Sequence, residues 1–232
     1  MPSPTFTESV YASGAVANIP RLISCGSGSG NHKIYVHEKQ KQSLVSFSFD
    51  APDDNPNGLT FDGTNLISCT PGRIYIHDGV SENTTSDFAS PGSVPSGLAF
   101  DGTNLISCDV ITGLIYIHDE VSSTITSSFA APWVSPSPTG LTFDGTNLIS
   151  CDYAVNRISV HDGVTVTVDR WFASYQNTPY GLAFDGVDLW DCAQSNDYIH
   201  QYIGISASRR QNFLAPNTAP SGLTYTVNPD HL

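Results

Sequence analysis

Three kinds of reactive side chain recur along the 232-residue sequence: a cysteine, a histidine and an aspartate. They stand at Cys25, Cys69, Cys108, Cys151 and Cys192, at His37, His77, His118 and His161, and at Asp62, Asp101, Asp144 and Asp185. A thiolate can act as a nucleophile, an imidazole as a general base, and all three side chains can bind a metal ion. Whether the copies act together depends on how far apart the fold holds them.

These residues belong to a repeated segment. "GLTFDGTNLISC" at 58–69 returns as "GLAFDGTNLISC" at 97–108 and "GLTFDGTNLISC" at 140–151, and a looser copy, "GLAFDGVDLWDC", stands at 181–192. Their first glycines are 39, 43 and 41 residues apart, and Gly222 follows 41 residues later. A period near 40 residues with several short β-like runs is typical of one blade of a β-propeller.

Each unit contains four runs that we expect to be strands A, B, C and D of a four-stranded blade. In the second unit these are "GLTF", "NLISC", "RIYIH" and a Ser/Thr-rich run that ends in Phe-Ala. Asp-Gly pairs, which favour tight hairpin turns, follow strand A in four units. No window has a sustained 3.6-residue apolar period, so the sequence predicts an all-β fold without helices.

The number of strands predicts a closed ring of five blades. The first unit has strands B, C and D but lacks strand A, and a lone strand A, "GLTYTV", ends the chain at 222–227. We expect 222–227 to pair beside 22–25, because closure removes exposed sheet edges. Residues 21–232 would then form a single propeller. Residues 1–20 would be an N-terminal extension, whose surplus D-like strand "FTESVYAS" at 6–13 is a candidate for self-association.

The pattern "GLTFDGTNLISCD…NRISVHDG" resembles the NHL and lactonase-like propeller families over residues 21–227. Their units have a similar Gly-Leu-Ala-Phe-Asp start and a similar Asn-Arg-Ile segment. The resemblance implies the propeller fold, and it leaves the activity open because this repeat type serves lyases, lactonases and binding modules. Those families have six or seven blades. A count of five is more similar to the lectin tachylectin, although no lectin motif is present.

Ring geometry would keep the repeated cysteines and histidines apart. With strands about 4.8 Å apart, cysteines at the end of strand B would lie roughly 14 Å from each other. A disulfide needs Cα atoms within about 7 Å, and an odd number of cysteines also argues against a disulfide framework. Histidines at the end of strand C would be roughly 20 Å apart, with Tyr202 in the fifth copy. We therefore expect five unpaired buried thiols and four hydrogen-bonded structural histidines.

The repeated aspartates would lie nearer the axis, roughly 8 Å apart. Four carboxylates at that distance could hold a Ca²⁺ ion. Each Asp can instead cap its own Asp-Gly turn, and Thr226 interrupts the ring at the fifth position. The sequence favours the turn-capping role and predicts neither a metal nor a cofactor.

Four aromatic residues break the repeat, in contrast to the phenylalanine that recurs near the end of each strand D. They are Trp133, Tyr153, Tyr175 and Tyr180. They fall in the D–A links and a B–C loop, which share one face of a propeller. Exposed rings on loops suit stacking on a sugar or on an apolar patch of a partner. We take these four as candidate ligand-binding residues, and the alternative is that they only cover the tops of the blades.

The composition limits the classes of partner that the protein is expected to bind. The net charge of −13 argues against nucleic acid and anionic membranes. No apolar run approaches the roughly 18 residues of a transmembrane segment, and the N-terminus has no signal-peptide pattern. Only 13% of residues are charged, against about 25% in an average domain. Uncharged polar surfaces are common on extracellular and cell-surface proteins, although the compartment is not determined by this pattern.

The repeats favour a binding protein over an enzyme, because catalysis needs distinct groups at one place. Only the fifth unit departs clearly, through Trp190, Asp191 and His200. We therefore expect a non-enzymatic binding or scaffold propeller that recognises a glycan or a protein partner through one loop face. The alternatives are a propeller hydrolase or lyase of the lactonase kind, and a self-assembling structural protein.

Overall fold

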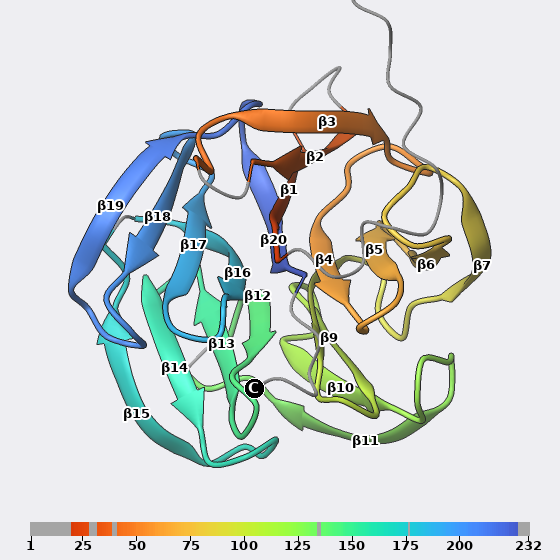
Figure 1. Ribbon diagram of the computed structural model, residues 1–232. Coiled ribbons are helices and arrows are strands. Elements are labelled where there is room, and N and C mark those ends of the chain that lie inside the picture. The colour runs from red at the N-terminus through yellow and green to blue at the C-terminus, as the bar shows by residue number, and fades with distance from the viewer. Residues whose placement is uncertain (1–19, 28–31, 39–40, 134–135, 176, 227–232) are drawn as a thin grey trace, which may run out of the picture.

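The protein is a ring of five four-stranded antiparallel sheets, a five-bladed β-propeller (Figure 1). The computed structural model describes residues 20–27, 32–38, 41–133, 136–175 and 177–226. Twenty strands and no helix lie in these ranges, so the described part of the chain has no helix able to cross a membrane. The predicted all-β propeller is confirmed. The surplus strand expected at 6–13 lies outside the described residues.

The strands of the five blades follow the repeat. Blade one consists of β20 (Pro220–Tyr225), β1 (Leu22–Gly26), β2 (Lys33–His37) and β3 (Val45–Asp50). Blade two consists of β4 (Gly58–Phe61), β5 (Leu66–Thr70), β6 (Arg73–His77) and β7 (Thr84–Ala89). Blade three consists of β8 (Pro95–Phe100), β9 (Leu105–Asp109), β10 (Leu114–His118) and β11 (Ile125–Ala130). Blade four consists of β12 (Pro138–Phe143), β13 (Leu148–Asp152), β14 (Arg157–His161) and β15 (Val168–Ala173). Blade five consists of β16 (Pro179–Phe184), β17 (Leu189–Ala193), β18 (Tyr198–Tyr202) and β19 (Arg209–Leu214).

The ring closes through the C-terminal strand, as the sequence predicts. Strand β20 pairs antiparallel with β1, with Cys25 opposite Gly222 and Ser24 opposite Leu223. The strand starts at Pro220, two residues before the expected start. Beyond it, the backbone N–H of Arg21 donates to Thr226 Oγ1 at 2.8 Å. The first blade therefore contains both the beginning and the end of the described chain.

The repeated glycine lets the innermost strands approach each other. A Cβ at Gly58 would lie 2.9 Å from Cys69 Sγ and 3.0 Å from the carbonyl oxygen of Ser96 in the next blade. At Gly140 a Cβ would lie 2.3 Å from the Tyr180 carbonyl oxygen. These distances are too short for a side chain, so the repeat needs glycine wherever one strand A packs against the next.

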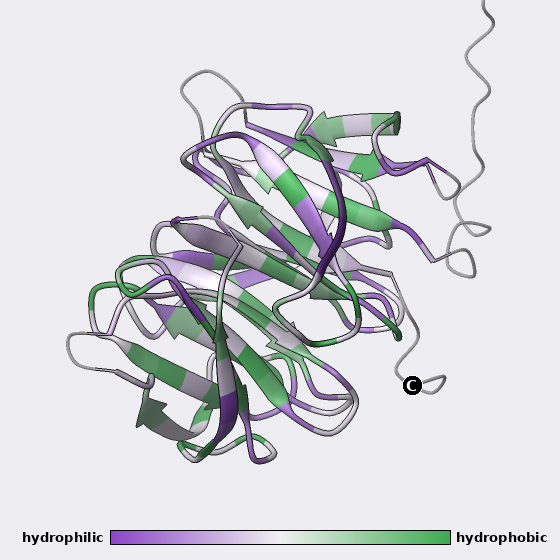
Figure 2. Cartoon of the chain, turned by 90° about the vertical axis from the view of Figure 1, so that its left-hand side faces the viewer, coloured by the Kyte–Doolittle hydropathy of each residue, from purple (hydrophilic) through white to green (hydrophobic). Residues whose placement is uncertain are grey.

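The hydrophobic core lies between blades rather than within them. One cluster joins Ile23 and Cys25 of blade one to Leu59 and Leu66 of blade two. Figure 2 shows hydrophobic and hydrophilic segments alternating along the strands, which is the pattern of sheets packed face to face.

Rings also interlock the blades further from the axis. Phe49 of blade one packs on His77 of blade two, with centroids 5.9 Å apart. The same contact recurs around the ring as Phe88–His118, Phe129–His161, Phe172–Tyr202 and Phe213–His37, all at 5.8 or 5.9 Å. Each blade thus packs on the next through a ring contact between the same two repeat positions.

Candidate functional site

The repeated cysteines are structural. All five are free, buried thiols, as the spacing predicted. The Cys25 Sγ lies 3.5 Å from the carbonyl oxygen of Pro56 in the next blade, and Cys69 makes the same contact with Pro95 at 3.6 Å. Burial raises the pKa of Cys25 and of Cys108 to about 12. A thiol that stays protonated at neutral pH is a poor nucleophile.

The repeated histidines are also structural. Their Nε2 atoms pair with a serine hydroxyl of strand B, in Ser24–His37, Ser68–His77, Ser107–His118 and Ser150–His161, at 2.8 or 2.9 Å. The Nδ1 of His77 lies 2.7 Å from the Ser81 carbonyl oxygen. Burial lowers the pKa of each of these histidines, and lowers that of His37 to about 4. A neutral ring then donates from Nδ1 to the carbonyl and accepts the serine proton at Nε2.

The repeated aspartates cap turns, which confirms the interpretation favoured from the sequence. Asp62 Oδ1 accepts from the backbone N–H groups of Thr64 at 2.8 Å and Asn65 at 2.6 Å. Asp101, Asp144 and Asp185 make the same two bonds to the second and third residues after them. Within the described ranges, no three Asp, Glu, His or Cys side chains converge as metal ligands.

Blade five replaces the serine–histidine pair with a charged network. Asp191 takes the serine position, and its Oδ2 accepts from Tyr202 at 2.6 Å and from Ser174 Oγ at 2.9 Å. His200 Nδ1 lies 2.9 Å from Asp191 Oδ1. The side chains of Asp191 and His200 are fully buried, and His200 Nε2 has no hydrogen-bond partner in the described part of the chain. Burial and the neighbouring Asp191 raise the pKa of Tyr202 well above its ordinary value.

A second departure from the repeat lies on blade four, where two tryptophans enclose an arginine. The Arg157 guanidinium carbon is 4.3 Å from the ring centroid of Trp133 and 3.9 Å from that of Trp171. The two indoles meet edge to face at 5.6 Å. Trp133 has a φ of 93°, where a bulky residue is strained, and its buried Nε1 has no partner among the residues that the structure describes. Trp171 is 48% exposed on β15.

A similar stack lies on blade five. Tyr175 follows β15 in the link to blade five and is 49% exposed. The Arg209 guanidinium carbon lies 3.9 Å from its ring centroid. The backbone N–H of Tyr175 donates to Tyr202 Oη at 3.1 Å, and the Tyr175 ring lies 5.9 Å from that of His200. Tyr175 therefore joins an exposed surface to the buried network beneath it.

The other two predicted aromatics lie elsewhere. Tyr180 is half-buried on β16 and packs against the cluster that contains Trp190 and Leu223. Burial raises its pKa to about 12, and the nearby Tyr153 adds to this shift. Tyr153 is 40% exposed after β13. In the described ranges no ring contact joins Trp133 to Tyr175, so these two predicted residues belong to separate stacks, and Tyr153 and Tyr180 belong to neither.

Sequence reasoning missed Trp171, Arg157 and Arg209. Trp171 could have been found by the criterion applied to the other aromatics, because Asp87, Ser128 and Asn212 stand at its position in other blades. The arginines gave no such signal, because their importance comes from stacking across strands and links.

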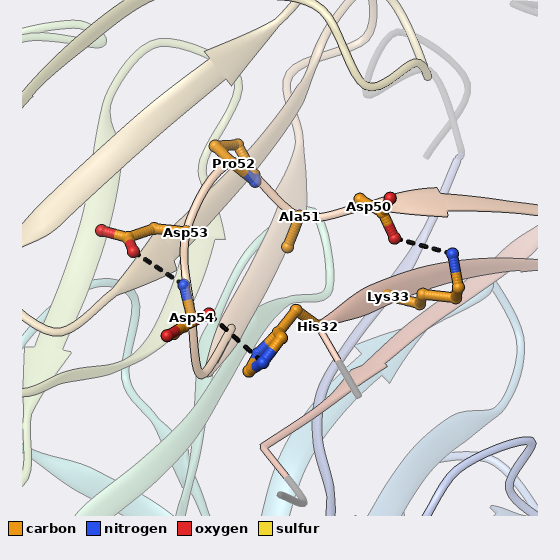
Figure 3. A pocket seen from close by; sticks show the side chains of 7 residues that line it. All are labelled: His32, Lys33, Asp50, Ala51, Pro52, Asp53 and Asp54. Carbon is orange, nitrogen blue, oxygen red and sulfur yellow. Dashed lines mark hydrogen bonds and ion pairs between the residues drawn. The ribbon is translucent and has the colours of Figure 1, made fainter. Parts of the chain in front are cut away.

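An open pocket of about 460 Å³ lies where the link from blade one to blade two passes β2 (Figure 3). Two ion pairs cross it, Lys33–Asp50 at 2.6 Å and His32–Asp54 at 3.2 Å. The aspartates of both pairs are 73% exposed. The paired side chains are thus open to water, and the lining offers no buried charge to a ligand.

Comparison with known proteins supports the fold alone. No family model and no curated protein matches the chain, so membership of the NHL-like or lactonase-like families is not shown. Among solved structures, the chain is similar to a glutaminyl cyclase from Myxococcus xanthus with a TM-score of 0.57 and 13% identity. The match covers 73% of this chain and 69% of that one, and it is one of 1292 matching chains. A fold shared this widely does not indicate one activity.

Proposed function

We propose that the protein is a non-enzymatic binding propeller that recognises a glycan through the loop face of blades three to five. The observation that carries this proposal is the pair of aromatic–arginine stacks on neighbouring blades. Trp171 and Tyr175 expose about half of their surface. At the place of Trp171 the other blades have Ser48, Asp87, Ser128 and Asn212, and at the place of Tyr175 they have Pro52, Pro91, Pro132 and Pro216. Aromatic faces suit the apolar faces of sugar rings.

The stacks are suited to binding because they are held in place before a ligand arrives. An arginine over an aromatic ring contributes on the order of 0.5–2 kcal/mol, depending on desolvation. The strained φ of Trp133 is consistent with a functional role, because such strain tends to be kept at binding sites. Rings fixed in this way lose little conformational freedom on binding, which favours affinity.

A glycan array followed by titration calorimetry tests the proposal. Trp171→Ala and Tyr175→Ala should each weaken binding of the identified glycan while the melting temperature stays within a few degrees of wild type. Val166→Ala is the control, because Val166 is 57% exposed in the β14–β15 turn and belongs to neither stack. Unchanged affinity in both aromatic variants would exclude this surface as the binding site.

A hydrolase is the second candidate, and one observation favours it. His200 Nδ1 lies 2.9 Å from Asp191 Oδ1, as in a histidine oriented to act as a general base, and its buried Nε2 has no hydrogen-bond partner among the described residues. Hydrolysis of a chromogenic ester or lactone by wild type, with loss of the activity in His200→Gln, would support it. Hydrolysis rates equal to those in buffer alone, over a broad panel of esters and lactones, would exclude the hydrolase function.

A further inference from the structure

In the described part of the chain, Arg157 and Arg209 have no carboxylate partner. Arg21 has none either, but its guanidinium group donates to Ser46 Oγ at 3.0 Å. Arg73 pairs with Asp87, Arg170 with Asp169 and Arg210 with Asp188, all within 3.1 Å. In the described part of the chain, no carboxylate lies within 4.0 Å of Arg157 or Arg209. The chain has 22 acidic and 9 basic residues, so unpaired guanidinium groups stand out against an excess of carboxylates.

Both guanidinium groups are instead held by aromatic rings. Arg157 lies against Trp133 and Trp171, and Arg209 lies over Tyr175. Stacking uses a flat face of a guanidinium group, and the in-plane N–H donors that do not point at a second ring stay available. Both arginines are half-buried, so each lies at the surface of the protein. Planar donors of this kind match the two oxygens of a carboxylate or sulfate group.

The carboxylate nearest to Arg157 along the sheet is already occupied. Asp152 stands opposite Arg157 in the β13–β14 pair. Its Oδ2 accepts from the Ser137 N–H at 2.7 Å, and its Oδ1 accepts from the Ala154 N–H at 2.9 Å. These bonds keep Asp152 facing the loop backbone and leave Arg157 available for an external anion.

We infer that the ligand is an acidic polysaccharide, whose carboxylate or sulfate groups bind Arg157 and Arg209 while its sugar rings stack on Trp171 and Tyr175. The inference rests on the proposed glycan-binding function and names the class of glycan. The net charge of −13 opposes approach of a polyanion at long range. At physiological salt this repulsion is screened beyond about 8 Å, so the local guanidinium groups determine binding.

Four polymers test the class of ligand by biolayer interferometry at physiological salt. Polygalacturonate carries carboxylates, heparin carries sulfates, dextran is neutral, and polyglutamate is an acidic peptide. We expect polygalacturonate or heparin to bind at least roughly ten-fold more tightly than dextran and polyglutamate, because a charge-assisted hydrogen bond is strong enough for that factor. Which of the two binds identifies the anionic group.

The other outcomes separate the inference from the proposed function. Equal binding of dextran would overturn the inference and leave the proposed function intact. Equal or tighter binding of polyglutamate would overturn the saccharide assignment. Binding of a neutral glycan on the array with no binding of either acidic polysaccharide would overturn only the inference, whereas no saccharide binding at all would overturn both.

Variants test the two arginines. Arg157→Gln and Arg209→Gln should each weaken polyanion binding roughly ten-fold. Arg170→Gln is the matched control, because it makes the same charge change on β15 and removes only an exposed ion pair with Asp169. Binding equal to wild type in both test variants would overturn the inference.

Arg157→Lys tests the role of Arg157 in anion binding if the Arg157→Gln variant fails to fold. Lysine keeps the charge but cannot make planar paired bonds to a carboxylate or sulfate. Its affinity should fall several-fold, and an unchanged affinity would overturn the role of Arg157.

Discussion

Blade two and blade five have different side chains at the same pair of positions on strands B and C. In blade two, Ser68 and His77 form a neutral buried pair whose polar atoms are all satisfied within the blade. In blade five, Asp191 and Tyr202 replace them, and the carboxylate takes donors from blade five and from the link that precedes it. The repeat pair stabilises one blade, whereas the blade-five network ties two blades together beneath the exposed Tyr175. Departure from the repeat thus marks the region where we place binding.

The largest difference in unfolding free energy between blades two and five should appear when the strand-B side chain of each network, Ser68 or Asp191, is replaced by alanine. Asp191→Ala leaves the His200 N–H and the hydroxyl groups of Tyr202 and Ser174 without their acceptor, and it should cost about 3–5 kcal/mol of unfolding free energy. Ser68→Ala removes one hydrogen bond of a neutral pair and should cost about 1 kcal/mol. Urea unfolding at pH 7 measures both. Equal losses would show that the two positions are energetically alike.

Acid should destabilise the blades that contain the repeated histidines. Burial lowers the folded-state pKa of His37 to about 4, below its ordinary value of 6.5. The unfolded state therefore binds the proton more readily, so stability is present above pH 6.5 and falls as the pH drops toward 4. A shift of this size corresponds to about 3 kcal/mol. Urea midpoints at pH 7, 5.5 and 4.5 measure the loss, and His37→Gln should reduce its slope with pH. A midpoint that stays constant over this range contradicts the neutral-pair account.

Converting blade five toward blade two sharpens the comparison. Asp191→Ser alone leaves Tyr202 and His200 with a weaker acceptor, whereas Asp191→Ser combined with Tyr202→His restores the repeat pair. The double variant should recover on the order of 1 kcal/mol relative to the sum of the single losses, because residues in one network couple. Purely additive losses in urea unfolding would mean that the pair does not form in blade five.

The smallest effect should come from the exposed rings. Trp171→Ala removes a ring that is 48% exposed and should change stability by at most about 1 kcal/mol. The matched comparison is Trp190→Ala, which removes a fully buried indole bonded to Asp185 and should cost about 3–5 kcal/mol. Thermal melts of the two variants distinguish them, and a large loss for Trp171→Ala would assign that ring to the scaffold.

Most of the fold could be predicted from the sequence because the pattern of one blade recurs in five units. The glycine of strand A, the Asp-Gly turns and the surplus "GLTYTV" segment lead directly to five blades and to the β20–β1 closure. The separate places of the repeated cysteines and histidines followed from strand spacing. These inferences needed only local patterns and symmetry.

The candidate site was harder because it depends on side-chain contacts between blades. Trp133 and Tyr175 were visible as breaks in the repeat, but their arginine partners were not, because neither Arg157 nor Arg209 is adjacent to its ring in sequence. The Asp191–His200–Tyr202 network was seen only as a departure. Its meaning required the pairing of β17 with β18, which brings Asp191 opposite His200.

Hydrogen–deuterium exchange with and without polygalacturonate or heparin, whichever binds, tests the central claim most directly. We place binding on the residues that break the repeat. It predicts that the ligand slows exchange in residues 153–157 and 171–180, around the two stacks, and leaves the corresponding segments of blade two, 71–73 and 87–96, unchanged. Slower exchange around all five blades, or confined to blades one and two, would contradict the claim that the broken repeat marks the binding face.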